Sequence, residues 1–337
     1  MDDKMNKLES DVAITSRVRL ARNYRDIPFP PMMNEIWAGE SVRRTQDALG
    51  SVPEGREYTV HRLSELSENE RMKMVEHHLI SPALLAKGDT AAVMISGQGD
   101  VSVMVNEEDH LRIQALLPGL SLGECYRRAG EVDDWIERSE DYAFDVEKGY
   151  LTSCPTNTGT GLRGSVMLHL PVLSMIRQIA PIVQAVGKIG LTVRGIYGEG
   201  TEAVGCLYQI SNQVTLGRAE EDILESLAAT ARQLIEREGE ARKRLFEQNH
   251  IELEDKLMRS WGIFTNARRM DSKEFMKLLS DVRLAVDLDV LPGGLRPKID
   301  SLMEDAQPAS LNERFGGSVP AQERDRLRAQ VVRETMA

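Results

Sequence analysis

The sequence predicts an α+β protein in which a larger mixed domain precedes a smaller, all-helical one. Apolar runs with strand-like alternation mix with helix-like stretches up to about residue 245, and only charged helical segments follow. The chain has 337 residues, of which 41% are hydrophobic, so it can bury a sizeable core. We therefore expect one domain over 1–245 and a second, helical one over 246–337.

The elements of the larger domain follow from the spacing of its apolar residues. Residues 11–20 are expected to be extended, with Arg17 and Arg19 on one side, because residues two apart in a strand share a face. A hairpin is expected where the apolar runs 91–96 and 101–105 flank a glycine-containing turn. In chain order, the other expected elements are helices over 67–85 and 122–141, a strand over 166–170, a helix from Pro171 to about 188, strands over 191–194 and 203–210, and a long helix from about 219 past 237.

The last predicted helix carries a pair of arginines. Pro320 is expected in the first turn of a helix over 321–333, where Arg324 and Arg328, four residues apart, share a face. Two guanidiniums placed in this way can clamp one phosphate. An exposed helix in which Asp325 pairs with these arginines is the simpler interpretation on this evidence alone.

Composition excludes several classes of protein. The three cysteines show no metal-binding or disulfide spacing, and the N-terminal residues lack a hydrophobic signal core. No apolar run approaches the roughly 18 residues that a membrane span needs. A net charge of −11 disfavours general binding to nucleic acid. We expect a cytoplasmic protein that binds neither nucleic acid nor membrane.

An unusual acidic cluster follows the predicted hairpin. Glu107, Glu108 and Asp109 are consecutive and stand beside His110 and Arg112. Like charges at a strand end repel each other unless a cation, a metal or a proton compensates them. This cluster therefore predicts a site for something positive, either a cationic substrate or the water shell of Mg²⁺.

A glycine-rich stretch suggests an anion site. Residues 159–164 fit GxGxxG, but a strand is expected after them and no acid occurs between Tyr150 and Gly198, so a dinucleotide fold is excluded. The loop still permits backbone N–H groups to approach a phosphate, with Arg163 adding charge. Since the chain has no P-loop and no protein-kinase motifs, a nucleotide would have to be held by arginines.

Phosphoryl transfer needs positive charge around the transferred group. Five arginines stand in candidate strands or loops, and a single well-placed arginine can contribute about 10³ to 10⁵ in rate. Scattered surface arginines would be the ordinary alternative. These five arginines are Arg17, Arg19, Arg112, Arg163 and Arg194.

If the cationic substrate is a guanidinium, it would need carboxylates to take its proton. A guanidinium has a pKa of about 12.5 to 13.8, so deprotonating it at pH 7 costs roughly 7 to 9 kcal/mol. Glu107, Glu108 and Glu199 are candidates for gripping such a cation. Cys154 is a candidate thiolate for the same group, although a buried, inert cysteine remains the alternative.

Several long motifs occur in the order found in one enzyme family. Ser16 to Arg19, Asn106 to Arg112, Leu151 to Asn157, Gly161 to Arg163 and Arg194 to Glu202 resemble the motifs of the phosphagen (guanidino) kinase family. The resemblance covers about residues 11 to 240. Within that family, the chain is most similar to the McsB-type protein arginine kinases.

The resemblance implies a fold and a set of site residues. It implies a large antiparallel sheet flanked by helices, with ATP and Mg²⁺ as cofactors. It makes Glu108 the catalytic base, Glu107 a contributor to the Mg²⁺ shell rather than a direct ligand, Glu199 the second guanidinium-binding carboxylate and Cys154 the thiolate contact. The implied ATP-binding residues are Thr15, Ser16, Arg17, Val18, Arg19, His78, Arg112, Arg163, Gly164, Ser165, Val166, Met167, Arg194, Gly195, Ile196, Tyr197 and Gly198.

The chain differs from the members of this family that phosphorylate small guanidino metabolites, and these differences favour a protein acceptor. Those enzymes carry a helical domain before the Ser16 to Arg19 segment, whereas here that segment begins at residue 16. Residues 194–202 have also lost an arginine and a histidine that those enzymes usually have. We expect an open pocket that admits an arginine on a protein surface.

The resemblance extends to the C-terminal helix and to partners. Arg324, Asp325, Arg328 and Ala329 match a motif with which McsB-type kinases bind phosphoarginine. The expected function is ATP-dependent phosphorylation of protein arginines that marks proteins for Clp-type proteolysis, with a homodimer and an activator protein as further expectations. The alternatives are a kinase of a free guanidino metabolite and a non-catalytic phosphoarginine-binding adaptor.

Overall fold

The computed structural model describes residues 2–51, 57–195 and 203–337. Within these residues, an eight-stranded antiparallel sheet has the strand order β2-β3-β4-β5-β1-β8-β10-β9. This confirms the predicted α+β class and its antiparallel sheet. The strands are β1 Ala13–Arg22, β2 Tyr58–Arg62, β3 Ala92–Ser96, β4 Val101–Val105, β5 Leu111–Pro118, β8 Leu162–His169, β9 Leu191–Gly195 and β10 Leu207–Asn212, with a separate small pair β6 Phe144–Asp145 and β7 Gly149–Tyr150.

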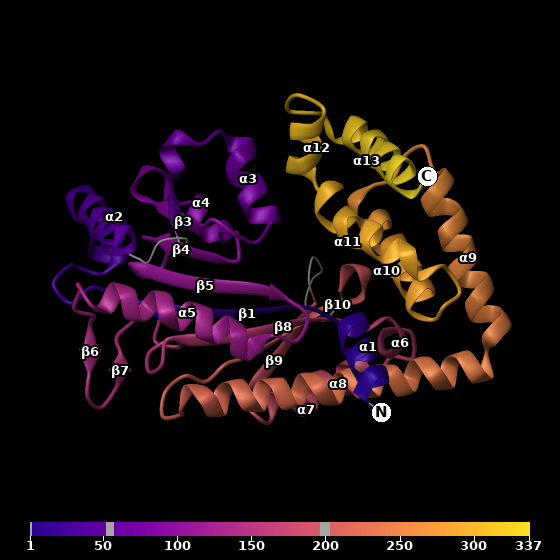
Figure 1. Cartoon of the computed structure of the whole chain (residues 1–337), viewed down its shortest axis with the longest axis horizontal. Coiled ribbons are helices and arrows are strands. Elements are labelled where there is room, and N and C mark those ends of the chain that lie inside the picture. The colour runs from indigo at the N-terminus through magenta and orange to yellow at the C-terminus, as the bar shows by residue number, and fades with distance from the viewer. Residues whose placement is uncertain (1, 52–56, 196–202) are drawn as a thin grey trace.

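Helices cover the two faces of the sheet differently. Helices α5 and α8 pack against one face, while α3 and α4 lie over part of the other (Figure 1). The helices of the larger domain are α1 Asp2–Val12, α2 Glu35–Gly50, α3 Glu68–Glu76, α4 Pro82–Leu85, α5 Leu122–Glu137, α6 Pro171–Met175, α7 Ile179–Gly187 and α8 Glu220–Gln248, with short 3₁₀ turns at Pro30–Met32, Leu63–Glu65, Gly88–Thr90 and Val204–Cys206.

The C-terminal region is all helical, as predicted. It consists of α9 His250–Asn266, α10 Ser272–Asp287, α11 Arg296–Asp305, α12 Pro308–Arg314 and α13 Ala321–Met336, with a 3₁₀ turn at Gly293–Leu295. The predicted division between residues 245 and 246 falls within α8, which continues to Gln248 before the chain turns into α9. Figure 1 shows these helices returning from α9 toward α3. No helix in the described part of the chain is both long and apolar enough to span a bilayer.

Two predicted helices are each broken in two. The segment over 67–85 forms α3 and α4, and the segment after Pro171 forms α6 and α7. At each break one residue adopts a left-handed backbone, His78 with φ 58° and Arg177 with φ 59°. Such a residue cannot continue a right-handed helix. The apolar spacing carried no sign of these breaks.

Several other elements were not expected from the sequence, or begin at other residues than expected. Helices α1 and α2, strands β2 and β5 and the small pair β6 and β7 were not predicted. The strand expected over 203–210 begins only at Leu207, because residues 204–206 form a 3₁₀ turn. Strand β5 matters most, since it is the partner of both β1 and β4 and carries Arg112.

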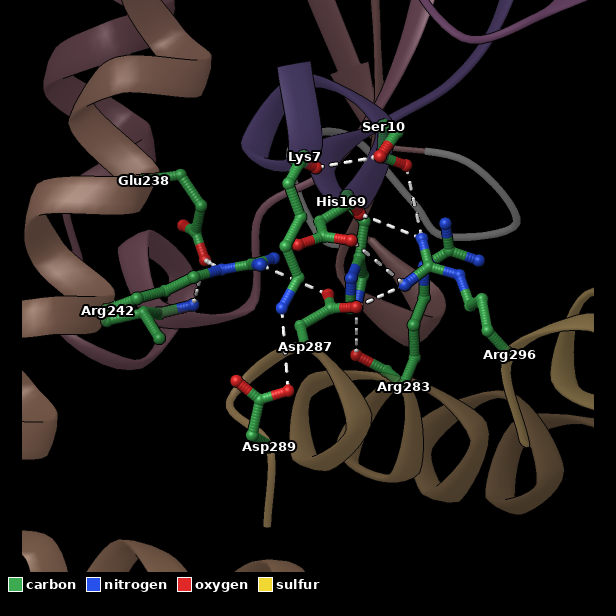
Figure 2. Close-up of polar contacts among 12 residues, drawn as sticks. Lys7, Ser10, His169, Glu238, Arg242, Arg283, Asp287, Asp289 and Arg296 are labelled. Carbon is green, nitrogen blue, oxygen red and sulfur yellow. Dashed lines mark hydrogen bonds and ion pairs between the residues drawn. The ribbon is translucent and has the colours of Figure 1, made fainter. Parts of the chain in front are cut away.

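A buried charged network joins the sheet domain to the C-terminal helices (Figure 2). Glu238 of α8 is 0% exposed; it accepts hydrogen bonds from the first N–H groups of α6 and from Nε of Arg242 at 2.9 Å. Arg242 donates to Asp287 of α10 at 3.1 Å, and Arg296 of α11 pairs with the same carboxylate. Removing one member would leave a buried charge without its partner, which typically costs about 3 to 5 kcal/mol. This network therefore holds the two regions in one arrangement.

Candidate active site

One face of the sheet gathers the arginines of neighbouring strands. Strand β1 lies between β5 and β8, where Arg17 pairs with Ser165, and Arg19 pairs with Gln114 on one side and Arg163 on the other. Directly opposed residues of antiparallel strands point to the same side of the sheet. Arg17, Arg19 and Arg163 therefore share one face, which we call the arginine face.

The remaining two arginines extend this face in both directions. Arg112 lies two residues before Gln114 on β5, and Arg194 of β9 pairs with Gln209 of β10. Gln209 in turn accepts a hydrogen bond from Nη2 of Arg17 at 3.4 Å. The structure thus brings together all five arginines singled out from the sequence.

The arginine face is electrostatically strained. Burial, followed by repulsion from Arg112 and Arg163, lowers the pKa of Arg17 to about 10. The pKa of Arg19 is also lowered, by burial first and then by the same like-charged neighbours and Arg17. Among residues 2–51, 57–195 and 203–337, Nε of Arg19 and Nε of Arg163 are buried and find no hydrogen-bond partner. Unpaired donors and mutual repulsion are both relieved by a polyanion, so this face suits a chain of phosphates.

The acidic cluster forms a tight loop between β4 and β5. Asn106 has φ 65°, and its side chain accepts from Ser41 Oγ at 2.6 Å while donating to two backbone carbonyls. Glu107 is 1% exposed; it accepts from Arg112 Nη1 at 2.5 Å and from Ser81 Oγ. The charge on Glu107 is therefore compensated by Arg112, which this contact also holds in place.

The other two acids of the cluster meet different partners. Asp109 is buried and accepts from Asn23 Nδ2 and from the backbone N–H of Ser153, both at 2.7 Å. Glu108 is the exposed member, with 44% of its side chain accessible. Within the described residues, no group of three His, Cys, Asp or Glu side chains is arranged to hold a metal. The cluster thus places one solvent-accessible carboxylate, that of Glu108, beside the arginine face.

Glu108 faces both the arginines and the cysteine loop. Its Oε2 lies 3.6 Å from Nη2 of Arg112 and 3.5 Å from Nδ2 of Asn157. Burial and the charges of Arg194 and Arg112 lower the pKa of Arg163, while Cys154 and Glu108 oppose that shift. Glu108, Cys154, Arg112 and Arg194 thus all lie near enough to Arg163 for their charges to act on it.

Cys154 differs from the other two cysteines. Its sulfur lies 3.0 Å from Thr156 Oγ1 in a partly accessible loop. Burial raises the pKa of the Cys125 thiol to about 12 and also raises that of Cys206. Asp109 holds the loop of Cys154 through the N–H of Ser153. Of the three thiols, Cys154 is thus the one placed beside the candidate site.

In the nucleotide-binding segments predicted from the sequence, successive side chains point to opposite faces of the sheet. Thr15, Arg17, His78, Ser165 and Met167 line a small cavity of about 80 Å³ together with Leu116 and Gln209. Other predicted residues face the helices α5 and α8 and lie in the core; Ser16, Val18 and Val166 are each 0% exposed, and Gly164 is also buried. The side chains of this second set are separated from the arginine face by the sheet itself.

The structure gives the glycines of the predicted phosphate-binding loop a role in packing. A side chain at Gly159 would lie 2.6 Å from the carbonyl oxygen of Thr215, and one at Gly161 would lie 2.6 Å from that of Ala21. The N–H groups of Gly159 and Gly164 already donate to Tyr150 and Asn212. These glycines let segments of the protein approach one another, and only Arg163 of this motif faces the site.

One predicted segment falls outside the described residues. Ile196, Tyr197, Gly198 and Glu199 belong to the gap over 196–202, and Gly195 is the last residue of β9 before it. The described residues therefore contain one of the two carboxylates expected to grip an acceptor, namely Glu108.

The arginines of α13 have different surroundings. Arg328 is 1% exposed and donates to the carbonyls of Ala306 and Met270, both at 2.9 Å, and to Asp325 at 3.0 Å. Arg324 is partly exposed and donates to the carbonyl of Val319 at 3.0 Å. Ala329 is buried. The motif is thus integrated into the helical domain, and its role in binding phosphoarginine stays a prediction.

Three supporting residues were missed in the sequence. Asn23 bridges the acidic loop to the cysteine loop, Gln209 contacts Arg17, and Ser81 contacts Glu107. Asn23 directly follows β1 and Gln209 lies in β10. Both residues come close to the site only because these strands pair with distant strands of the sheet. Ser81 caps the first turn of α4, as its bond to the N–H of Leu84 shows, and this capping position was the only available signal.

The chain matches two known protein families, one over the sheet domain and one over the C-terminal helices. The family described as "ATP:guanido phosphotransferase, C-terminal catalytic domain" matches residues 40–241, more than half of the chain. The chain belongs to this family. A second match, "Protein-arginine kinase McsB C-terminal domain", covers residues 250–337 and begins where α9 begins.

Within this family, the chain is similar over nearly its whole length to proteins named protein-arginine kinase. The chain is 46% identical over 330 residues to the protein-arginine kinase of Bacillus subtilis strain 168, covering 97% of this chain and 91% of the relative. It is 46% identical over 332 residues to that of Moorella thermoacetica, covering 98% and 95%. The chain is thus a phosphotransferase of the protein-arginine kinase branch, as predicted from its motifs.

Solved structures of the family share the fold. The duplicated taurocyamine kinase from Schistosoma mansoni, with bound transition state analog components, matches with a TM-score of 0.63 and 29% identity over 69% of this chain and 34% of that chain. The present chain therefore spans about a third of that duplicated enzyme. Lombricine kinase matches with a TM-score of 0.61 and 26% identity, over 68% and 67% of the two chains.

Proposed function

We propose that this protein transfers the γ-phosphoryl group of Mg·ATP to arginine side chains on the surface of other proteins. The observation that carries the proposal is the meeting of two opposite sets of charge in one place. Five arginines share one face of the sheet, and the accessible carboxylate of Glu108 lies 3.6 Å from one of them, Arg112. Among the residues that the structure describes, the Nε atoms of Arg19 and Arg163 are buried without a hydrogen-bond partner. A polyanionic donor and a cationic acceptor would each find their complement there.

The arginine face would hold the donor. Arg17, Arg19, Arg112, Arg163 and Arg194 would neutralise the phosphate oxygens and the charge that develops on the leaving ADP. Because the sheet holds four of them at fixed register positions and Glu107 holds Arg112, little reorganisation would be needed when ATP binds. Such preorganised charge supplies the largest part of catalysis in phosphoryl transfer.

Glu108 would activate the acceptor. A guanidinium nitrogen would attack the γ-phosphorus, the bond between that phosphorus and the bridging oxygen of ADP would break, and the nitrogen's proton would pass to the Glu108 carboxylate. Glu199 would hold another nitrogen of the same guanidinium, and Cys154 would contact it as a thiolate. Asn157, 3.5 Å from Glu108, is placed to orient that carboxylate.

Magnesium belongs to the substrate in this scheme, since it arrives with the phosphates of ATP. Glu107 is proposed to shape the water shell of that ion while keeping its contact with Arg112. The Glu107 carboxylate is buried and already has two side-chain partners, so an outer position suits it better than a direct metal bond.

The test compares protein and free arginine as acceptors. Incubation with ATP and casein, beside ATP and free arginine, should produce acid-labile phosphate on casein only. Phosphorylation of free arginine alone would instead identify a guanidino-metabolite kinase. Phosphoarginine binding without any transfer would identify an adaptor. Loss of transfer in Glu108→Ala, with an unchanged melting temperature, is expected if Glu108 is the base.

The wider role is also part of the proposal. Relatives named protein-arginine kinase support protein substrates. We further propose a cytoplasmic homodimer that responds to an activator protein, binds phosphoarginine through Arg324 and Arg328, and marks its substrates for a Clp-type protease. Pull-down of the protease with the phosphorylated substrate, and not with the unmodified one, would test the last step.

A further inference from the structure

Exposed apolar side chains gather at the start of α2. Met32, in the 3₁₀ turn before this helix, is 83% exposed. Ile36 and Trp37, in the first turn of the helix, are 80% and 37% exposed. Isolated exposed apolar residues are ordinary on a protein surface, whereas clustered ones mark interaction sites. We call Met32, Ile36 and Trp37 the apolar patch.

The segment that carries the apolar patch is attached to both ends of the loop that contains Glu108. At one end, Asn106 Nδ2 donates to the carbonyl oxygen of Ala38 on α2 at 3.0 Å. At the other end, His110 Nε2 lies 3.0 Å from the carbonyl oxygen of Pro28. Figure 1 shows α2 at the end of the sheet where β5 begins. Because Glu108 lies between Asn106 and His110, the patch has a fixed position near the carboxylate proposed to activate the acceptor.

Aromatic packing makes the same attachment rigid. The rings of Phe29 and His110 meet edge to face with their centroids 6.1 Å apart, and Tyr24 stacks on the same histidine at 5.6 Å. Burial lowers the pKa of His110 to about 4, so this histidine is neutral near pH 7. It therefore adds no positive charge that would repel a cationic acceptor from Glu108.

The chain around the apolar patch carries negative charge. Residues 26–42 include Asp26, Glu35 and Glu40 and contain no lysine or arginine. Arg44 compensates part of this charge by pairing with Asp26 and Glu40, while Glu35 is exposed at the first position of α2. An apolar patch with acidic surroundings is complementary to a segment that carries both apolar and cationic side chains. A stretch of substrate protein around a target arginine has this character when an apolar residue lies near the arginine.

The distance from the apolar patch to Glu108 can be bounded from the chain. Ile36 lies two residues before Ala38 in α2. Glu108 lies two residues after Asn106, whose side chain bonds to Ala38. Adding these two steps to that contact places Ile36 within about 20 Å of Glu108. An extended chain spans about 3.3 Å per residue, so roughly six residues cover this distance.

We propose that the apolar patch docks the part of a substrate protein next to its target arginine, so that the enzyme favours arginines with an apolar residue within about six positions. This inference rests on the proposed function, since it takes Glu108 as the residue that meets the acceptor. The observation that carries it is the attachment of the patch segment to both ends of the loop of Glu108. The patch thereby selects among the arginines of a substrate by their neighbours in sequence.

A peptide series separates docking from chemistry. Each peptide has a single arginine in a chain of serine and glycine, and one leucine is moved from about two to about ten positions away on either side. The best leucine peptide, with its leucine within about six positions, should have a kcat/KM about tenfold above that of the peptide without leucine, and the gain should lie in KM. Equal values throughout the series would overturn the proposal. Transfer to no peptide, and none to casein, would instead sink the proposed function.

Substitutions on the apolar patch assign the leucine preference to it. Ile36→Glu should reduce the ratio of kcat/KM between the best leucine peptide and the leucine-free peptide from about ten to about one. An acid is well tolerated in the first turn of a helix, so this variant should fold. Met32→Glu tests the same patch from outside the helix and serves if Ile36→Glu does not fold. Ile251→Glu is the matched control, because Ile251 is 77% exposed in the first turn of α9.

The outcomes separate the occupants of the apolar patch. A ratio that stays near ten in folded Ile36→Glu and Met32→Glu would overturn the proposal. So would a lower sedimentation coefficient in Ile36→Glu than in the unaltered protein, because it would assign the patch to contacts between copies of this chain. A ratio near one with unchanged sedimentation, beside a ratio near ten in Ile251→Glu, is the result expected if the patch docks the substrate.

Discussion

The carboxylate of Glu108 lies 3.6 Å from the guanidinium of Arg112, across the loop that joins β4 to β5. One short loop thus places a group proposed to activate the acceptor next to a group proposed to hold the donor. Glu107, the residue before Glu108, accepts a hydrogen bond from Arg112 and so fixes the distance between Arg112 and Glu108. Transfer of a phosphoryl group requires that donor and acceptor be held within bonding reach, and this loop is built to do so.

Glu108→Gln should reduce transfer to casein by about 10² to 10⁴, because the amide cannot take the proton of the guanidinium. The melting temperature should change by less than one degree, since the side chain is 44% exposed. Calorimetry should show ADP affinity within twofold of normal. Glu247→Gln, at an exposed position on α8, is the matched control. Full activity in Glu108→Gln would remove Glu108 from the role of base.

Arg19→Met should make the protein more stable and less active. Arg19 is buried among like charges that lower its pKa, so replacing it with an apolar side chain relieves repulsion and desolvation. We expect a gain of about 1 to 2 kcal/mol in the free energy of unfolding. Transfer should fall by about 10³. Arg25→Met, at an exposed arginine, should alter neither quantity. A lower melting temperature in Arg19→Met would contradict the strain inferred for this face.

Asp109→Ala should impair the acceptor side of the site while sparing the donor side. The buried carboxylate holds Asn23 and the N–H of Ser153, so its loss frees the loop of Cys154. We expect transfer to fall at least tenfold with ADP affinity retained. Asp145→Ala is a suitable control, because Asp145 also accepts two backbone N–H groups, in a turn away from the site. Equal losses in both variants would assign Asp109 a general structural role.

The contact between His77 and Glu304 should make stability depend on pH. The hydrogen bond to Glu304 raises the pKa of His77 above its ordinary value of 6.5, and the same bond lowers the pKa of Glu304. The stabilisation from His77 is therefore complete below about pH 6.5 and is lost as the pH rises through its raised pKa. The melting temperature of Glu304→Gln should lie furthest below normal near pH 6 and approach normal as the pH rises through the raised pKa of His77. A gap that widens with pH would contradict this pairing.

The two arginines of α13 should respond differently to substitution. Arg328→Ala should lower the melting temperature by several degrees, because two backbone carbonyls and Asp325 lose a buried partner. Arg324→Ala should leave it within about one degree. Both should weaken binding of phosphoarginine in calorimetry. Arg326→Ala lies between them on the exposed side of α13, pairs only locally with Glu323, and serves as the control. Unaltered binding in Arg324→Ala would argue against the motif.

Local sequence patterns predicted the elements that form largely independently of distant parts of the chain. The hairpin of β3 and β4 and the helices α5, α8 and α13 follow from apolar spacing and turn residues within a few positions. The breaks at His78 and Arg177 did not, because a left-handed residue other than glycine is held by its surroundings. For His78 those surroundings include Gln114, 36 residues away.

By itself, the sequence determined the family, the α+β class, and the placement of Arg17 and Arg19 on one side of a strand, because motifs and alternation are local properties of the chain. Only the tertiary structure decided that Arg112, Arg163 and Arg194 join them, that Glu108 is the accessible acid of its cluster, and that α11 lines a cavity beside His78. The reason is that β1 pairs with strands about 100 and 150 residues further along the chain. Pairing over such separations depends on the whole core, which no local pattern encodes.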